Sequence, residues 1–295
     1  MKKRMLFVYN PHAGKARIRS NLLDIIDVFV KAGYEVTVYP TQQHGDATKA
    51  VTERDGSYSM VACSGGDGTL NEVISGMMQS EKKLPIGYVP AGSTNDFAAS
   101  LSIPGNMLSA ANVIVSGKGI PCDIGSFNKE YFVYVAAFGL FTDVAYETDQ
   151  NLKNALGHFA YVMEGARRIG AIQSYHMRIK YNDEEIEDDF AFGMITNSKS
   201  VGGVKNITGR SVKLDDGLFE VTLVKTPSQL MELQEILIAL MSGKGDMKNV
   251  RSFKTDHLIF NADQDVAWTL DGEFGGSLRY VEITNNNRAV EMIVP

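Results

Sequence analysis

Four short apolar runs divide the first third of the chain, and each is followed by a polar loop with glycine and then, in most cases, by a helical pattern. The runs are Met5–Tyr9, Val36–Tyr39, Met60–Cys63 and Ile86–Val89. Repeated strand, loop and helix units predict a parallel sheet with helices packed on it. The four loops then lie at the carboxyl ends of the strands, the edge where such sheets bind ligands. The sequence therefore predicts one binding crevice shared by four loops.

The pattern changes near Asp123. Beyond it, short apolar runs and period-two alternation predict mainly antiparallel strands and a second domain. The predicted strands are Tyr131–Ala136, Met177–Tyr181, Phe190–Ile195, Leu218–Val224, His257–Phe260, Trp268–Leu270 and Val290–Val294, and the predicted helices are Leu152–Ile169 and Leu230–Met241. We expect an α/β protein with an N-terminal Rossmann-like parallel-sheet domain at 1–125 and a β-sandwich domain at 126–284. Residues 285–295 could return to the first domain.

Composition narrows the classes of function. With 295 residues, 44% of them hydrophobic, the chain can bury a large core, and its length suggests about two domains. A formal net charge of −6 argues against a nucleic-acid binder and against attachment to anionic lipid by overall charge. The two cysteines, Cys63 and Cys122, lack metal-ligand spacing and are predicted to be reduced thiols in a cytosolic protein.

The stretch Ser64–Val73 is the strongest candidate for a binding loop. Apolar residues at helical spacing follow it, namely Leu70, Val73, Ile74 and Met77, so its glycines lie where a strand meets a helix. Backbone N–H groups at such a junction can bind an anion. A carboxylate such as Asp67, about 4 Å from a phosphate charge, is repelled by roughly 4 kcal/mol at an effective dielectric of about 20. A bridging Mg²⁺ would reverse that sign, so we expect a phosphate ligand with magnesium.

Three common phosphate-binding templates do not match this loop. The Walker pattern is absent around Gly14 and Lys15, the dinucleotide fingerprint fails at Gly66–Asn71, and the protein-kinase motifs are missing. Many glycine clusters after a strand are only tight turns. The polar residues Asp67, Thr69 and Asn71 favour a functional loop here.

The segment Gly65–Thr69 resembles the nucleotide-binding signature of the diacylglycerol kinase catalytic-domain superfamily, which includes sphingosine kinases and bacterial soluble lipid kinases. Further stretches resemble that family in order and spacing: Asn10–Gly14, Thr41 with Gly45–Ala47, Pro90–Phe97, Leu214–Gly217 and Leu270–Glu273. The resemblance covers essentially the whole chain. The glycine signature alone is less specific because NAD kinases share it.

This resemblance implies that ATP binds across the four loops. The implied nucleotide contacts are Asn10, Pro11, His12, Ala13, Gly14, Thr41, Gly66, Asp67, Gly68, Thr69, Leu70, Asn71, Glu72, Val73 and Thr94. Asp67 would hold Mg²⁺ directly or through water. Thr41 and Thr94 could instead act as helix N-caps.

Two acidic turns also gain roles from the resemblance. It makes Glu273 the proton acceptor, with Asp271 beside it as a second carboxylate that raises its basicity. It also implies a structural Mg²⁺ held by the Asp216 carboxylate and by the backbone carbonyls of Lys213 and Leu218. Without the family, each would be interpreted as a solvated turn.

The sequence thus predicts a soluble ATP- and Mg²⁺-dependent kinase that phosphorylates a lipid hydroxyl, with diacylglycerol as the leading acceptor and phosphatidic acid as the product. Phosphatidylglycerol, a sphingoid base and a prenol remain open as acceptors. The same residues could also belong to an NAD kinase or to a non-catalytic nucleotide or lipid sensor. In NAD kinases an Asn-Glu pair lies well downstream of the glycine turn, whereas Asn71 and Glu72 follow it at once.

Membrane contact is expected to be peripheral. The longest uncharged, predominantly apolar run, Tyr131–Thr142, is shorter than the roughly 18 residues needed to span a bilayer. The basic residues Lys15, Arg17, Arg19, Arg167 and Arg168 could contact anionic headgroups, although solvated helix faces have the same pattern. We expect a cytoplasmic protein that meets the inner face of the membrane transiently, that can form a homodimer and that does not bind nucleic acid.

Overall fold

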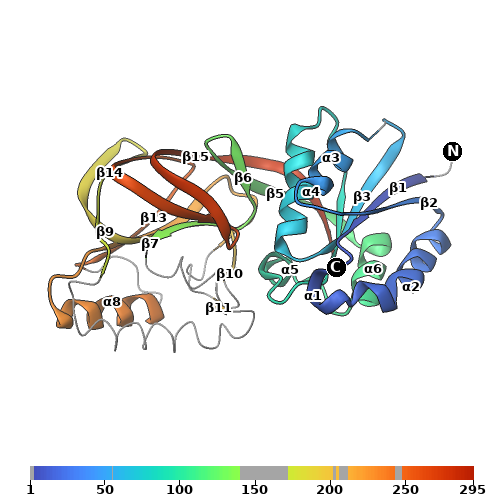
Figure 1. The fold of residues 1–295 in the computed structure, drawn as a ribbon, viewed down its shortest axis with the longest axis horizontal. Helices are drawn as coiled ribbons and strands as arrows, with labels where there is room; N and C mark the ends of the chain where they lie inside the picture. Colours follow the sequence, from blue (N-terminus) through green and yellow to red (C-terminus); the bar gives the residue numbers. More distant parts are fainter. Residues whose placement is uncertain (1–2, 55, 140–171, 202–203, 206–211, 243–247) are drawn as a thin grey trace. The chain divides into compact units, whose positions relative to one another are not determined.

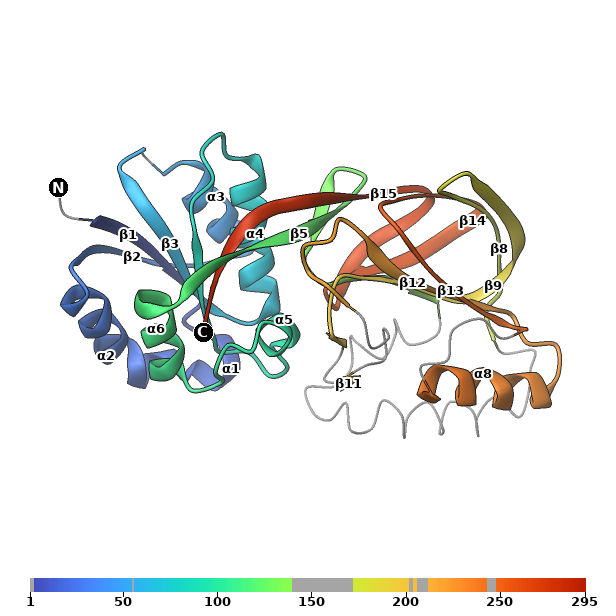
Figure 2. The same cartoon turned by 180° about the vertical axis from the view of Figure 1, so that it is seen from behind.

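The computed structural model describes residues 3–54, 56–139, 172–201, 204–205, 212–242 and 248–295 (Figures 1 and 2). The chain forms two compact units, one made of Met1–Asp123 with Arg288–Pro295 and the other of Ile124–Asn287. Helices and strands alternate in the first unit, and strands dominate the second, so the predicted mixed α/β class is confirmed. The predicted helix at Leu152–Ile169 lies outside the described residues.

Unit 1 is a parallel sheet with helices on both faces. Its elements are β1 (Lys3–Tyr9), α1 (Ala13–Ala16), α2 (Ile18–Lys31), β2 (Tyr34–Pro40), α3 (Asp46–Thr52), β3 (Tyr58–Gly65), α4 (Asp67–Gln79), β4 (Ile86–Pro90), α5 (Asp96–Ser100) and α6 (Met107–Ser116). Strand β1 pairs in parallel with β2 and β3, and β3 pairs in parallel with β4. Helices α2 and α6 pack together on one face, and α3 and α4 pack together on the other (Figures 1 and 2).

Helix α2 of unit 1 buries one apolar stripe against the sheet. In α2, Ile18, Ile25 and Phe29 recur at helical spacing and are buried. The Phe29 ring meets the ring of Phe7 in β1 edge to face, with 5.4 Å between the centroids. These contacts fix α2 against the sheet, because large buried aromatic side chains contribute most of the apolar area.

The last strand belongs to both units. Strand β15 (Glu273–Val294) pairs with β14 (His257–Leu270) in unit 2 and, at Met292, with Ile86 of β4 in unit 1. Strand β5 (Lys118–Phe127) also pairs with β15. The carboxyl-terminal residues therefore return to the first unit, the arrangement that the sequence left open for 285–295.

Unit 2 is antiparallel. Its other elements are β6 (Glu130–Phe132), β7 (Val135–Gly139), β8 (Tyr175–Tyr181), β9 (Glu184–Thr196), β10 (Ser200–Val201), β11 (Val204–Lys205), β12 (Phe219–Lys225), α8 (Leu230–Ser242) and β13 (Val250–Thr255). Trp268 lies at the centre of its core, with its ring centroid 5.2 Å from Phe127, 4.8 Å from Phe138 and 5.1 Å from Phe260.

Three strand predictions for unit 2 need correction. The runs His257–Phe260 and Trp268–Leu270 belong to one strand, β14, whose pairing with β15 shifts register between Asn261 and Val266. The polar residues in this irregular stretch interrupt the apolar pattern without ending the strand. The run Tyr131–Ala136 is instead divided between β6 and β7. A short apolar run does not show where a strand turns.

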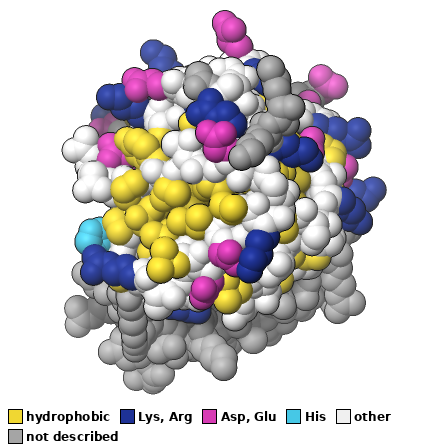
Figure 3. All heavy atoms as spheres, turned by 90° about the vertical axis from the view of Figure 1, so that its right-hand side faces the viewer, with side chains coloured by type: hydrophobic (Ala, Val, Ile, Leu, Met, Phe, Trp, Pro, Cys, Tyr) yellow, Lys and Arg dark blue, Asp and Glu magenta, His cyan; other side chains and the backbone are white. Residues whose placement is uncertain are grey.

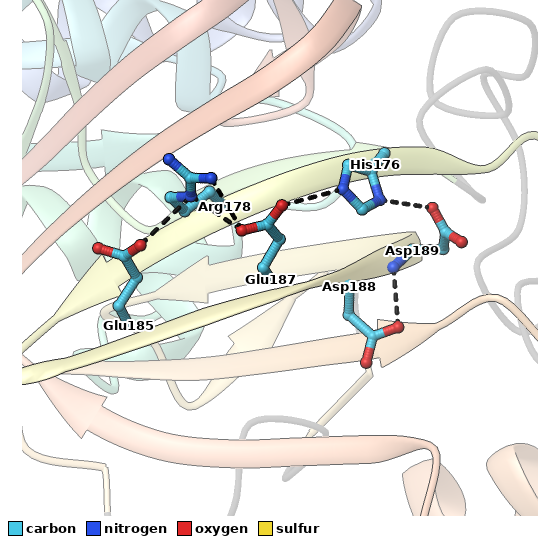
Figure 4. A network of polar contacts seen from close by, with 6 residues as sticks. All are labelled: His176, Arg178, Glu185, Glu187, Asp188 and Asp189. Atoms are coloured by element: carbon cyan, nitrogen blue, oxygen red, sulfur yellow. Dashed lines mark hydrogen bonds and ion pairs between the residues drawn. The ribbon is translucent and has the colours of Figure 1, made fainter.

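A row of ion pairs sets the pairing of β8 with β9 (Figure 4). Each basic residue of β8 lies opposite an acidic residue of β9: His176 faces Asp189, Arg178 faces Glu187, and Lys180 faces Glu185. The corresponding contacts are 3.0, 2.9 and 3.0 Å. A slip by one residue would turn these charges toward the buried face of the sheet, so the row favours the observed register.

His176 provides a pH-dependent test of this row. Its side-chain hydrogen bonds to Asp189 and then Glu187 raise its pKa above the ordinary value of 6.5. Stability from these contacts is therefore fully present below the unfolded-state pKa and is lost as pH rises through the higher folded-state pKa. NMR titration of the imidazole should give a pKa above 6.5 in the wild type and a lower value in Asp189→Asn. An unchanged pKa in Asp189→Asn would contradict the assignment.

One face of unit 1 carries clustered apolar side chains (Figure 3). Among the described residues of this unit, the exposed large hydrophobic side chains are Leu23 and Val30, both in α2. Strand β2, which α2 contacts, is the last strand at this end of the sheet, and Val36 and Val38 in it are half-buried. This face combines exposed apolar side chains with an open strand edge.

Candidate active site

Backbone hydrogen bonds join the predicted loops at the carboxyl ends of their strands. The Asn10 N–H after β1 donates to the carbonyl of Ser64 in β3 (2.9 Å). The Ala91 N–H after β4 donates to the carbonyl of Gly65 (2.8 Å). The loops after β1, β3 and β4 therefore converge at the amino-terminal end of α4.

Glycines allow these loops to approach one another. Gly14 has a φ of +53°, and a Cβ there would lie 1.6 Å from the Ala91 carbonyl oxygen. A Cβ on Gly92 would lie 2.7 Å from the Gly66 Cα. Side chains at these positions would force the loops apart, so the glycines leave the backbone of all three loops accessible to a ligand.

Asp67 connects the two loops nearest to the start of α4. It is the first residue of that helix, and its Oδ2 accepts hydrogen bonds from Thr94 Oγ1 (3.3 Å) and from the Asp96 N–H (3.4 Å). Burial, and next the charge of Asp67, hold the pKa of Tyr88 well above its ordinary value. Asp67 and Thr94 together offer the oxygen ligands that Mg²⁺ prefers.

Asn95 is a structural residue of the site that the sequence predictions did not include. It adopts the left-handed conformation, with a φ of 52°. Its Oδ1 accepts from the Gly92 N–H (2.9 Å) and the Tyr88 hydroxyl (3.2 Å), and its Nδ2 donates to the Gly92 carbonyl (2.9 Å). The signal was present, because asparagine tolerates this conformation and closes turns with its own side chain.

A helix-cap role for Thr41 and Thr94 does not fit the structure. Helix α3 begins after Gly45, and α5 begins after Asn95. Thr41, 9% exposed, instead donates from its N–H (2.9 Å) and from its Oγ1 (3.4 Å) to the Tyr9 carbonyl. This places the loop after β2 next to the loop after β1.

Glu72 points toward the loop that precedes α3. Its carboxylate accepts the N–H groups of Gly45 (2.9 Å) and Ala47 (3.0 Å). The family resemblance placed Glu72 among the nucleotide contacts, and its side chain is here engaged in fixing the amino-terminal end of α3. Three-dimensional proximity between residues about 25 positions apart was needed to see this.

The other predicted nucleotide contacts differ in accessibility. Leu70 and Val73 are 1% and 0% exposed, so their side chains belong to the core. Thr69 is buried, Asn71 accepts from Ser75 (3.3 Å), and His12 is exposed, with its N–H donating to Asn10 Oδ1 (2.9 Å). The remaining predicted contacts, all half-buried, are Pro11, Ala13, Gly14, Gly66 and Gly68.

In unit 2, Asp271 is surrounded by backbone donors. Its carboxylate accepts the N–H groups of Val133 (2.7 Å), Tyr134 (2.9 Å) and Val135 (3.0 Å). Its own N–H donates to the Val135 carbonyl, and its carbonyl accepts from the Tyr134 hydroxyl. Asp271 is 7% exposed and has a φ of 52°. Two residues on, Glu273 is exposed at the start of β15.

The second predicted metal site is the turn before β12. Asp216 Oδ1 accepts the Leu218 N–H (3.2 Å), and its Oδ2 lies 3.5 Å from Lys254 Nζ. The side chain of Lys213 is exposed. Among the described residues, no group of three or more His, Cys, Asp or Glu side chains is arranged to hold a metal ion.

Both halves of the chain match models of known families. Residues 4–127 match the diacylglycerol kinase catalytic domain, and residues 135–293 match the YegS C-terminal NAD kinase beta sandwich-like domain. A diacylglycerol kinase of Staphylococcus saprophyticus is 34% identical over 280 residues, covering 94% of this chain and 91% of the relative. One from Bacillus subtilis is 32% identical over 298 residues, covering 99% and 97%.

The chain belongs to the diacylglycerol kinase family. As a member, it is a lipid kinase, an enzyme that transfers a phosphoryl group to a lipid hydroxyl. A solved diacylglycerol kinase from Bacillus anthracis has the same fold, with a TM-score of 0.77 at 22% identity, covering 100% of this chain and 97% of that chain.

Within the described residues, no helix is both long and apolar enough to cross a membrane. Phe274, directly after Glu273, is 61% exposed. Arg167 and Arg168, for which the sequence left headgroup contact and a solvated helix face open, lie outside the described residues. An exposed aromatic side chain thus adjoins the predicted proton acceptor.

Proposed function

We propose that this lipid kinase uses ATP and Mg²⁺ to phosphorylate a hydroxyl of diacylglycerol, giving phosphatidic acid. The observation that carries the proposal is the convergence of three loops at the start of α4, where Gly14, Gly66 and Gly92 leave backbone groups accessible beside Asp67. The curated relatives named diacylglycerol kinase support the choice of acceptor.

The loops of unit 1 would bind the nucleotide. The N–H groups at the start of α4 and the positive end of its dipole favour the phosphates. Asp67 and Thr94, which are hydrogen-bonded to each other, would hold Mg²⁺, which supplies neutralisation of the phosphate charge. Glu72 and Asn95 would act by holding the loops in position, since their side chains already contact loop backbone.

Glu273 would accept the proton of the acceptor hydroxyl. As that proton leaves, the hydroxyl oxygen forms a bond to the γ-phosphorus, and the bond from that phosphorus to the bridging oxygen breaks to release ADP. An exposed carboxylate at the end of a fixed turn suits this role, because it can reach a substrate without leaving its hydrogen-bonded support. Asp271 would provide that support.

Partners follow from the proposed acceptor. Diacylglycerol resides in membranes, so we place the enzyme in the cytoplasm with transient contact at the inner face of the membrane. A homodimer is a further proposal, which light scattering of the purified protein would test. Co-sedimentation with vesicles of phosphatidylglycerol, with and without diacylglycerol, would test the membrane contact.

A radiolabelled-ATP assay tests the proposed acceptor. The purified chain is incubated with Mg²⁺ and mixed micelles of diacylglycerol, phosphatidylglycerol, a sphingoid base or a prenol, and separately with NAD. We expect the label in phosphatidic acid. Label in another lipid would overturn diacylglycerol as the acceptor. Label in NAD, or ATP binding by calorimetry without label in any acceptor, would overturn the lipid-kinase proposal itself.

A further inference from the structure

The acidic turn before β12 lies against a lysine of the neighbouring strand. Strands β12 and β13 pair in antiparallel fashion, with Glu220 opposite Lys254. Lys254 Nζ lies 2.8 Å from Glu220 Oε1 and 3.5 Å from Asp216 Oδ2. One ammonium group therefore bridges two carboxylates, one in the turn and one in the strand that follows it.

The carboxylates beside this ammonium group are largely buried, so they depend on it for charge compensation. The side chains of Glu220, Asp216 and Lys254 are 9%, 22% and 33% exposed. The buried carboxylate needs a nearby cation, and the lysine supplies it.

The same geometry disfavours a divalent cation. Of the two Asp216 carboxylate oxygens, one accepts the Leu218 N–H and the other faces the ammonium. Magnesium requires a nearly octahedral set of oxygens at about 2.0–2.1 Å. Lys254 would repel a dication at Asp216. In the ligand set that the resemblance implies, the carboxylate of Asp216 is the only charged group, and it already accepts a hydrogen bond from the Leu218 N–H. The residues present do not fit the Mg²⁺ that the family resemblance implies here.

We propose that Lys254 is the resident cation of the Asp216 turn. Its ammonium holds the turn to the β12–β13 pair, and the turn binds no divalent ion in the wild-type chain. The proposal concerns only side chains of unit 2 and does not depend on which lipid the enzyme phosphorylates. It also predicts a latent site: without the ammonium, Asp216 and Glu220 would attract a divalent cation to the same position.

Divalent-ion binding and thermal unfolding of the full chain test this assignment. Mn²⁺, a paramagnetic substitute for Mg²⁺, is titrated into the wild type and Asp216→Asn and followed by electron paramagnetic resonance. We expect the two proteins to bind the same number of Mn²⁺ ions with the same affinity. Mn²⁺ binding by the wild type that is lost in Asp216→Asn would overturn the proposal.

Lys254→Met gives the complementary measurement. We expect the Tm of this variant to fall by at least about 5 °C, because a buried carboxylate loses its partner. Millimolar Mg²⁺ at constant ionic strength should restore part of that Tm. This Mg²⁺-dependent recovery of Tm should disappear in the double variant that carries both Lys254→Met and Asp216→Asn. Lys225→Met is the matched control, since Lys225 pairs with Asp188 at the surface, and its Tm should not respond to Mg²⁺.

The absence of any Mg²⁺ recovery in folded Lys254→Met would contradict the latent site. A Tm of Lys254→Met equal to that of the wild type would contradict the role of the ammonium. The comparison of wild type with Asp216→Asn leaves Lys254 intact, so it decides the main proposal even where Lys254→Met does not fold.

Discussion

Glu273→Gln is expected to lower kcat for lipid phosphorylation by about 10²–10⁴-fold, the usual contribution of a general base. Glutamine keeps the size of the side chain but cannot accept the hydroxyl proton. Glu273 is exposed at the start of β15, so the Tm should remain that of the wild type. The KM for ATP should also be unchanged, because the proposed nucleotide contacts all come from other loops. The measurement is steady-state kinetics with diacylglycerol micelles.

Glu282→Gln is a matched control for this variant. Glu282 belongs to the same strand and pairs with His257 (2.9 Å), away from the acidic turn in sequence. Its substitution should leave kcat near the wild-type value, because its carboxylate contacts His257 and Tyr280 and not the turn that carries Glu273. A near wild-type kcat in Glu273→Gln would show that another group accepts the proton.

Local sequence signals were enough to predict strands β1 to β4 of unit 1 and the loops that follow them. These strands are apolar runs, and each loop begins where such a run ends, so all four loops lie at the carboxyl edge of the sheet. The order along that edge, β2-β1-β3-β4, differs from the order along the chain and was not predicted. The sequence also contained the reason why Leu70 and Val73 are buried, because both lie on the apolar stripe of α4. Their inclusion among the nucleotide contacts came from the family resemblance and can hold only through their backbone atoms.

Long-range contacts account for what the sequence did not reveal. Glu72 acts on a loop 25 to 27 residues away, and Lys254 reaches Asp216 only because β13 pairs with β12. Strand β5 was not predicted, since Gly119 and Pro121 interrupt its pattern, and both residues are typical of strand edges and irregularities. Residue type is visible in a sequence, but the partner of a buried polar group depends on the tertiary fold.

Asp271→Asn is expected to destabilise unit 2 as well as to reduce activity. The carboxylate accepts three backbone N–H groups, and hydrogen bonds to a charged group contribute about 1.5–3 kcal/mol each. An amide retains one acceptor oxygen and turns a donor toward the remaining N–H groups. A loss of roughly 3 kcal/mol would lower the Tm by about 6–12 °C for a unit of this size. Thermal unfolding followed by circular dichroism provides the measurement.

Asparagine is the informative substitution because it tolerates the left-handed conformation of residue 271 at least as well as aspartate does. Any fall in Tm therefore reports the lost hydrogen bonds and not backbone strain. Asp263→Asn, at an exposed position of β14, is the control and should keep the wild-type Tm. Activity should fall together with Tm, since the turn that Asp271 fixes carries Glu273. If Asp271→Asn kept the wild-type Tm and lost only kcat, the carboxylate would act in the chemistry, as the sequence suggested. Val133 to Val135 lie 136 to 138 positions from Asp271 in the chain, so a sequence alone cannot separate a structural role of Asp271 from a catalytic one. The paired measurement of Tm and kcat can.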